Sequence, residues 1–490
     1  MKWTACILCV LFLIAIFLRF AFLNNNLFFG PEQGRDLLVV KDIVLNHKLT
    51  LIGSKTDISG VFHGPLFYYL STIPFILSHG DPLFISFFFV LINSATVFPL
   101  YLLGKKLRNK QVGLLAALLF AFSFNAIVYA RWLSNPPLSI PFAASAMYFL
   151  VAFLKGSKKS LLGFSIFIGL LNQAEFLNIL FYAVIIIGIY VIFFDRFRKL
   201  SPVFLFLNIV IITLLSVGTF ILFDLRHQFL ITNSILHLLT GQTGFSVSFL
   251  SSVEQCLSVF LTAFGMTVFP FWTIPGYVVL LASLIVVINI SRKQKEYNLF
   301  ILWLFIPVVL LICLHQNVLD QFFVSLLPAF LLLTAILVDA IWKKFFVGGL
   351  LVLLVLIFSS LFFWFQNIPS NTNIFFQLTQ PDLRYNDELA TIDQVYKESG
   401  NTPFAIQTYT IPYWSQQAWQ YLFWSYGEKR YGKAVGEEKD AKDLFVIIQA
   451  DPGNPAYQEA WLKNIVSTWG KLQKTFHYGI LTTREVQLER

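Results

Sequence analysis

The segment FFGPEQGRD, residues 28–36, places two carboxylates and a guanidinium within five residues: Glu32, Arg35 and Asp36. A carboxylate can act as a general base toward a hydroxyl group, and a guanidinium can bind phosphate oxygens through paired hydrogen bonds. Such a cluster is unusual in this chain, because only 12% of its 490 residues are charged. These three side chains are therefore the first candidates for chemistry.

Other polar residues lie at the ends of later apolar runs. They comprise two histidines, two arginines, two acids and an amide: His63, His227, Arg131, Arg226, Glu175, Asp224 and Asn135. A charge placed in hydrocarbon costs roughly 2.5–3.5 kcal/mol, so such residues usually face an internal cavity. We predict a cavity at membrane level, in which cations bind an anionic, lipid-linked substrate and an acid accepts a proton from an acceptor hydroxyl.

Structural roles remain open for several of these residues. Glu32 and Arg35 are spaced as a surface ion pair that could cap a helix, and Asp36 could be an acid favoured by the helix dipole. Arg131 could extend from a helix end to the membrane interface. His63, which precedes Gly-Pro, could serve only the conformation of its loop.

The composition indicates a polytopic α-helical membrane protein. Hydrophobic residues make up 57% of the chain, which contains 55 phenylalanines. Apolar runs of roughly 18 residues or more recur, and each can cross a hydrocarbon core of about 30 Å as a helix. The runs are continuous and lack the alternation of barrel strands.

Lysines and arginines gather in short segments between the apolar runs. These segments are KKLRNK (105–110), KGSKK (155–159), DRFRK (195–199), SRKQK (291–295) and WKK (342–344). The positive-inside rule places them in the cytoplasm. The basic residues behind the net charge of +9 thus mainly set the orientation of the protein in the membrane, and we expect no nucleic-acid partner.

The apolar pattern predicts eleven spans, or up to thirteen if two further runs are counted. The expected spans are 5–23, 83–103, 111–130, 137–154, 161–175, 177–194, 201–223, 273–290, 298–315, 321–340 and 345–365. Residues 24–82 form a long external loop, in which 35–49 is expected to be an interfacial helix. Residues 64–78 are too short to cross, and parity predicts that 250–271 do not cross or form half of a tight pair.

The chain is expected to divide near residue 365. Residues 1–365 form the transmembrane domain, and residues 366–490 are richer in polar residues and predict a small external α/β domain. Two of its segments are typical of strands, FAIQTYT (404–410) and DLFVIIQ (443–449). Helices are expected around 384–399, 416–430 and 456–465. The aromatic residues of PYWSQQAWQYLFW (412–424) are expected in the core, with stacking on sugars as the alternative.

Neither the cysteines nor the spacing of potential ligands indicates a cofactor. Cys6 and Cys9 form a CxxC inside the first apolar run, where packing explains them better than redox chemistry. No D-x-D, H-x-x-x-H or cysteine cluster supports a divalent metal. We therefore expect no cofactor and no metal. The first run lacks a small-x-small cleavage site and is expected to be an uncleaved anchor.

These motifs resemble those of the GT-C glycosyltransferases related to protein O-mannosyltransferases and the lipid A aminoarabinose transferase, glycosyltransferase family 39. Four family motifs, D-E-x-R-Y, K-P-P-L-Y-Y, Y-L-L-G-[KR]-[KR]-L and Y-x-R followed by [DN]-P, correspond to residues 32–36, 63–69, 101–107, 129–131 and 135–136. The resemblance covers roughly residues 1–340. The chain departs from it at Glu32, where the family has Asp, at His63, where it has Lys, and in GLLNQAE (169–175), which lacks T-K.

The resemblance implies the GT-C fold and the transfer of a sugar from a polyprenyl phosphate to an acceptor hydroxyl, with inversion at the anomeric carbon. It implies that Glu32 is the base and that Arg35 holds the donor phosphate or orients Glu32. We assign donor-phosphate binding to Arg35, His63, Arg131, Arg226 and His227. The other cavity residues are predicted to be Asp36, Asn135, Glu175 and Asp224.

The expected partners are a polyprenyl-phosphate sugar donor, membrane lipids, and an acceptor that is a lipid, a protein or a glycan. The expected location is the plasma (inner) membrane, with the active face and the C-terminal domain external or periplasmic. Three alternatives remain, namely a lipid-linked glycan ligase or polymerase, a membrane transporter, and a scaffold without catalysis. A transporter of the inverted-repeat type would show paired half-repeats, which the sequence does not contain.

Overall fold

The computed structural model describes residues 2–56, 58–240, 248–271, 273–315, 317–369, 383–411, 413 and 415–488. The chain forms two units. Unit 1 comprises Met1–Phe20, Leu49–Tyr69 and Phe89–Phe365, and unit 2 comprises Ala21–Lys48, Leu70–Phe88 and Gln366–Arg490. Helices α4 (Leu66–Ser78) and α5 (Pro82–Ser94) continue from one unit into the other.

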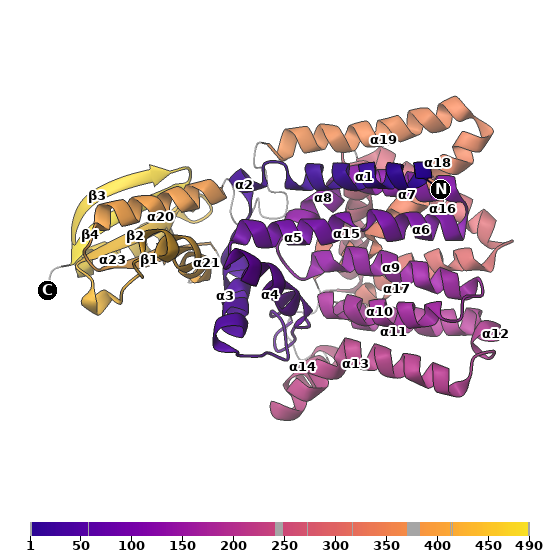
Figure 1. The fold of residues 1–490 in the computed structure, drawn as a ribbon, viewed down its shortest axis with the longest axis horizontal. Coiled ribbons are helices and arrows are strands. Elements are labelled where there is room, and N and C mark those ends of the chain that lie inside the picture. The colour runs from indigo at the N-terminus through magenta and orange to yellow at the C-terminus, as the bar shows by residue number, and fades with distance from the viewer. Residues whose placement is uncertain are drawn as a thin grey trace. The chain divides into compact units, whose positions relative to one another are not determined.

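Unit 1 is a bundle of apolar helices (Figure 1). Its long helices are α1 (Lys2–Phe20), α6 (Val97–Leu107), α7 (Lys110–Phe122), α9 (Ser139–Leu154), α10 (Ser160–Ala174), α11 (Leu177–Ile192), α13 (Pro202–Arg226), α14 (Leu230–Leu239), α15 (Phe249–Val268), α16 (Thr273–Ser291), α17 (Asn298–Leu314), α18 (Leu327–Lys344) and α19 (Phe346–Asn367). Shorter turns connect them, namely α8 (Phe124–Arg131), η1 (Pro136–Leu138), α12 (Phe194–Phe197), η2 (Lys295–Tyr297) and η3 (Asp320–Leu326).

Helix α18 is largely buried within this bundle. Every residue from Leu327 to Asp339 is buried, and the helix packs against α7, α9, α15 and α16. A helix that is apolar on all sides is stable when other helices surround it. The one acid in its buried part, Asp339, pairs with Arg108 at 2.8 Å and Lys343 at 2.9 Å, so its charge is compensated.

The structure confirms a polytopic helical membrane protein. By length and composition, the described residues contain nine helices that can cross a membrane, or ten if the bent pair α7 and α8 is one span. The spans predicted at 161–175 and 177–194 correspond to α10 and α11, which have 15 and 16 residues and are shorter than the other candidates. Glu175 lies between the two helices, and together with Asn172, Gln173 and Asn178 near the helix ends it interrupts the apolar run there.

The two apolar runs that were expected not to cross differ from each other. Helix α4 has 13 residues and therefore measures roughly 20 Å, which is less than the hydrocarbon thickness. Its length agrees with the prediction for residues 64–78. Helix α15 has 20 residues and is a candidate span by length and composition. Helix length therefore gives no support to the prediction that residues 250–271 do not cross.

Helices α7 and α8 meet at a bend of 56° next to Ser123. The Ser123 hydroxyl donates to the carbonyl of Thr267 at 2.7 Å, and Asn125 donates to the Thr267 hydroxyl at 3.0 Å. Polar contacts from this segment thus go to α15, as is common where a helix is interrupted. The bend sets the direction of α8, which ends at Arg131.

Unit 2 contains a mixed four-stranded sheet in the order β1-β2-β4-β3 (Figure 1). Strand β1 (Phe404–Tyr409) is parallel to β2 (Asp443–Gln449), and β4 (Leu481–Leu488) is antiparallel to both β2 and β3 (Gly470–Tyr478). Helices α20 (Tyr385–Ser399) and α23 (Pro455–Trp469) pack on the sheet. The remaining elements are α2 (Leu23–Asn26), α3 (Pro31–Asn46), α21 (Gln417–Leu422), the π-helix η4 (Phe423–Glu428), α22 (Lys429–Tyr431) and η5 (Glu438–Asp440).

The α/β character of the C-terminal segment is confirmed. Both predicted strands and all three predicted helices are present, with ends that differ by a few residues. The hairpin of β3 and β4 was not predicted, because most of β3 is exposed and polar and lacks the alternation of a half-buried strand. Trp419 and Tyr421 of the aromatic segment are buried, as a core role predicts, whereas positions 412 and 414 lie outside the described residues.

Helix α3 is held closely against α21 within unit 2. A Cβ atom at Gly34 would lie 2.4 Å from the Cα atom of Ala418, so the two backbones can approach only because residue 34 is glycine. The helix predicted for residues 35–49 is confirmed, but it begins earlier, at Pro31, and ends at Asn46. Proline suits this first position because its missing N–H would have no helical partner there.

Candidate active site

The predicted site residues are distributed over both units. Glu32, Arg35 and Asp36 belong to unit 2, where they form the first two turns of α3. The remaining predicted residues belong to unit 1: His63, Arg131, Asn135, Glu175, Asp224, Arg226 and His227. Each group is described within its own unit.

Glu32 is exposed in the first turn of α3. The turn is fixed by its neighbours, since the Gln33 side chain accepts a hydrogen bond from the N–H of Gly30 at 3.1 Å. The positive end of the helix dipole favours a carboxylate at this position. Glu32 is thus an accessible acid on a helix whose start is well defined, as a general base requires.

Arg35 and Asp36 form a pair on the same helix. The Arg35 Nε donates to Asp36 Oδ1 at 2.8 Å, and Asp36 is buried while the Arg35 side chain remains 37% exposed. Asp36 therefore orients Arg35, and Arg35 is the more exposed member of the pair.

In unit 1, the loop before α4 presents His63. The backbone N–H of His63 donates to the carbonyl of Ser54 at 2.9 Å, which joins the loop segments around residues 54 and 63. The next residue, Gly64, donates its N–H to the carbonyl of Gln173 at 3.0 Å, and a Cβ at Gly64 would lie 2.9 Å from Gln173 Cα. Glycine therefore allows the loop backbone to lie directly against α10.

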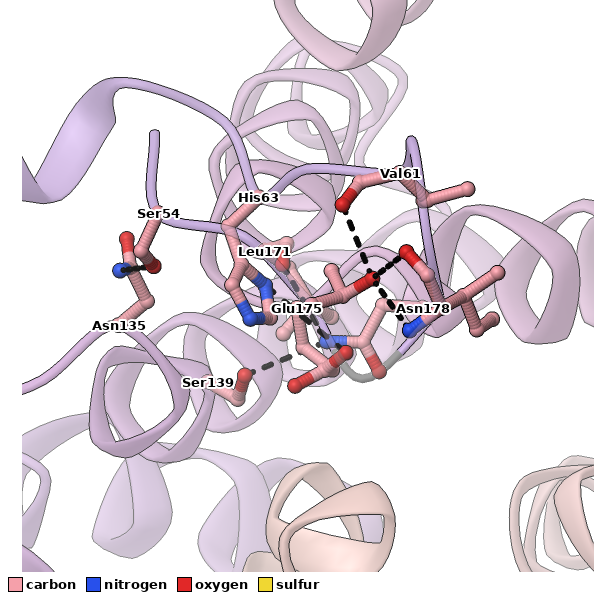
Figure 2. A network of polar contacts seen from close by, with 10 residues as sticks. Ser54, Val61, His63, Asn135, Ser139, Leu171, Glu175 and Asn178 are labelled. Carbon is pink, nitrogen blue, oxygen red and sulfur yellow. Dashed lines mark hydrogen bonds and ion pairs between the residues drawn. The ribbon is translucent and has the colours of Figure 1, made fainter. Parts of the chain in front are cut away.

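This approach brings His63 next to Glu175 (Figure 2). The His63 Nδ1 lies 3.9 Å from Glu175 Oε1, and the two side chains are only 9% and 4% exposed. Glu175 immediately follows α10, at the negative end of the helix dipole, where a buried carboxylate is unfavourable. A protonated His63 would offset that penalty. An acid retained in such an environment is a functional-site candidate.

The His63–Glu175 pair lines a small cavity together with Thr56, Ile58 and Gln321. Its volume is about 10 Å³, which is close to the space that one water molecule needs. Gln321 was not predicted as a site residue, because it follows Asp320 at the start of an apolar run, where polar residues often only mark a helix boundary.

Two amides join the helices around this pair (Figure 2). Asn178 donates to the hydroxyl of Ser139 at 3.2 Å and to the carbonyl of Leu171 at 3.3 Å. Asn135 is fully buried and donates to the hydroxyl of Ser54 at 2.9 Å, which ties the start of η1 to the loop. Asn178 was not predicted, although its spacing of three residues from Glu175 was a signal that could have found it.

Arg131 closes the end of α1. Its Nη1 donates to the carbonyl of Arg19 at 2.7 Å. Arg19 is itself fully buried and donates to Asn93 Oδ1 at 3.0 Å and to the carbonyls of Phe120 and Ala121 at 3.1 and 3.2 Å. Both arginines thus satisfy carbonyl groups where helices end or break. Arg19 was not a predicted site residue, and its contacts are structural.

Asp224 has the contacts of a helix cap. Its carboxylate accepts hydrogen bonds from the N–H of Ile231 at 2.7 Å, the N–H of Thr232 at 3.1 Å and the Thr232 hydroxyl at 2.5 Å. These donors belong to the first turn of α14, whose N–H groups have no partners within the helix. The geometry therefore favours a structural role over the predicted cavity role.

Arg226 and His227 follow at the end of α13, and both are exposed. The His227 ring stacks on Phe223 with centroids 3.9 Å apart, and its Nδ1 donates to the Phe223 carbonyl at 2.8 Å. Nε2 is therefore the His227 atom directed to other contacts. Phe223 also packs edge-on against Phe62, whose neighbour in the chain is His63, so the end of α13 and the His63 loop lie together.

The comparisons with known proteins agree with this architecture. Residues 62–223 match the dolichyl-phosphate-mannose-protein mannosyltransferase family. ArnT from Cupriavidus metallidurans bound to undecaprenyl phosphate has a TM-score of 0.63 at 9% identity, with 99% of this chain and 98% of that chain covered. The archaeal oligosaccharyltransferase AglB from Archaeoglobus fulgidus, in complex with an inhibitory peptide and a dolichol-phosphate, has a TM-score of 0.54 at 14% identity, with 96% and 72% covered.

The chain has the GT-C fold. The fold that the resemblance implied is thereby confirmed. The stretch that matches the mannosyltransferase family contains the His63 loop, the 101–107 motif and Glu175, and it begins after the EQGRD segment. No curated protein gives a significant match to the sequence.

Proposed function

We propose that this protein transfers a sugar from a polyprenyl-phosphate donor to an acceptor hydroxyl at the external face of the membrane, with inversion. The observation that carries this proposal is the mannosyltransferase family match of residues 62–223, in a chain that has the GT-C fold over nearly its whole length. The bound undecaprenyl phosphate of ArnT and dolichol-phosphate of AglB support the same class of donor.

In this proposal Glu32 accepts the proton of the acceptor hydroxyl as that oxygen attacks the anomeric carbon. The bond between this carbon and the phosphate oxygen breaks, and the polyprenyl phosphate leaves with the electron pair. Arg35, oriented by Asp36, and His63, which lies beside Glu175, are proposed to neutralise the leaving phosphate. Arg131, Arg226 and His227 are the further proposed phosphate contacts, and no divalent metal is required.

The test is Glu32→Gln in the full chain, reconstituted in vesicles with a labelled polyprenyl-phosphate sugar and membrane extract as acceptor. Loss of a general base is expected to lower the transfer rate by about 10²–10⁴-fold. The wild-type rate is expected to persist in EDTA. The matched control is Asp42→Asn, another exposed acid of α3 that pairs with Lys48, for which we expect an unchanged rate.

Near-normal transfer by Glu32→Gln would remove Glu32 from the mechanism without removing the transferase. Transfer only from a lipid-linked oligosaccharide would identify a glycan ligase instead. Uptake of label without any new glycosidic bond would identify a transporter and overturn the proposal.

A further inference from the structure

A second polar cavity lies in unit 1 among the basic loops, and none of the candidate active-site residues lines it. It has a volume of about 470 Å³, which is in the usual range of roughly 300–1,000 Å³ for small-molecule sites. Its walls come from the turn between α6 and α7 with Arg108, from the end of α16 and η2 with Asn289, Lys293 and Tyr297, and from the end of α18 with Lys343. Three separate basic segments of the sequence thus meet at one hollow.

The charge in this cavity is positive. Arg108 and Lys343 share a single carboxylate, because both bond to the same oxygen of Asp339. Lys293 adds a third cation, and no acidic residue lines the cavity. Amide and phenol groups from Asn289 and Tyr297 add hydrogen-bond donors. Three cations with neutral donors form an environment that suits a phosphate group.

An apolar stripe leads along α16 to this cavity. Exposed residues follow each other at helical spacing and thus lie on one face of the helix: Ile274, Val278, Leu281, Ile285 and Ile288. The next residues, Asn289 and Ile290, line the cavity. A soluble anion would not contact this apolar stripe. The acyl chains of a lipid can lie along it while the head group occupies the cavity.

We propose that this cavity binds the phosphate head group of an anionic phospholipid, whose chains lie along α16. The lipid would sit in the leaflet that the basic loops face. The proposal does not depend on the sugar-transfer reaction, since none of the residues proposed for catalysis lines the cavity.

The test measures lipid retained by the purified full chain in native mass spectrometry, after addition of phosphatidylglycerol or phosphatidylcholine. Two variants address the cavity, because Lys293→Gln removes one cation and Asn289→Phe fills space without changing charge. Arg108 and Lys343 are left intact because they compensate the buried Asp339. The matched control is Lys199→Gln, which removes an exposed lysine from another basic loop.

We expect wild type and Lys199→Gln to retain phosphatidylglycerol in preference to phosphatidylcholine. Lys293→Gln is expected to reduce retention about fivefold, the usual effect of one basic residue near an anionic lipid surface. Asn289→Phe is expected to reduce it at least as much, and melting in phosphatidylcholine shows that both variants are folded.

Three results would overturn the proposal. Retention by Lys293→Gln and Asn289→Phe could equal that of wild type, or Lys199→Gln could lose as much lipid as they do. In a third arm, inorganic phosphate without lipid could raise the melting temperature as much as phosphatidylglycerol does, which would assign the cavity to a soluble anion.

Discussion

At the scale of single residues, several polar groups in the described parts of the chain have clear structural partners, whereas Glu175 stands in a position that stability does not explain. Asp224 caps α14 and Asn135 binds Ser54, so both contribute to the fold. Glu175 differs, because its buried carboxylate lies at the end of a helix that disfavours negative charge. We therefore assign structural roles to Asp224 and Asn135 and keep Glu175 as a candidate for chemistry.

The variant Glu175→Gln is expected to keep or raise the melting temperature while lowering sugar transfer. Glutamine has the same shape and removes a charge that the helix end disfavours, but it no longer places a negative charge beside His63. The two side chains lie 3.9 Å apart, so the variant removes a charge–charge attraction of about 1–4 kcal/mol, and we expect a fall in rate of about 10–100-fold. Transfer assays and thermal melts of the purified chain measure both effects.

The control for this pair is Glu254→Gln, which removes an exposed acid from α15 in the same unit. We expect it to change neither transfer nor melting. Unchanged transfer in Glu175→Gln, or a large loss of stability, would assign Glu175 a purely structural role.

Glu388 of α20 is a buried acid in unit 2. Burial, together with the nearby Asp387, raises the pKa of Glu388 well above its ordinary value. At pH values between the pKa of Glu388 in the unfolded chain and its higher pKa in the folded chain, Glu388 is protonated in the folded state and ionised in the unfolded state. Stability thus falls as pH rises from the unfolded pKa toward the folded pKa.

We expect Glu388→Gln to stabilise α20 at neutral pH and to weaken this pH dependence. Hydrogen exchange of α20 in the full chain, measured from pH 5 to pH 8, checks both. The control is Glu398→Gln on the same helix, where the hydrogen bond from Lys474 lowers the pKa of Glu398 and the loss of the carboxylate should slightly destabilise α20 at neutral pH. The same response from both variants would contradict this account.

At the scale of elements, backbone contacts at glycines decide where the polar residues lie. Gly64 lets the His63 loop lie against α10, and Gly34 lets α3 lie against α21. The sequence pattern could predict α3, since its apolar residues repeat at helical spacing. It could not predict these contacts, because nothing in a local pattern specifies which backbone a glycine will meet.

The variant Gly34→Ala is expected to destabilise the packing of α3 by about 1–3 kcal/mol, the usual effect of overpacking. Its Cβ would lie 2.4 Å from the backbone of Ala418, so α3 must shift and transfer should fall with it. Thermal melts and hydrogen exchange of α3 measure the shift.

Gly218→Ala in α13 is the control, because its Cβ would meet only the Leu214 side chain, at 3.9 Å. Alanine in a helix interior is favoured over glycine by up to about 1 kcal/mol, so this variant should be neutral or more stable. Equal melting temperatures of the two variants would show that the packing of α3 against α21 does not require the close backbone approach at Gly34.

At the scale of the whole molecule, the distribution of basic segments predicts the orientation in the membrane. Helix length establishes a multi-pass protein, with nine candidate spans among the described residues, but length carries no direction. The loops rich in lysine and arginine are expected in the cytoplasm, and α3 outside. Glu32 can act on an external acceptor only if this orientation holds.

Single cysteines introduced in a cysteine-free background test the orientation in intact cells. Asn46→Cys, at the exposed end of α3, is expected to react with a membrane-impermeant maleimide, whereas Ser157→Cys, in an exposed basic loop, is expected to react only after lysis. The opposite labelling pattern would place Glu32 in the cytoplasm and refute the proposed external site.

The sequence by itself determined the membrane class, most of the helices and the short list of polar candidates. These properties depend on the length of apolar runs and on residue type, which are local. Only the tertiary structure decided that His63 faces Glu175 and that Asp224 caps α14. Such pairings arise when loops and helix ends pack against one another, and the energy of a buried charge depends on partners that the local sequence does not contain.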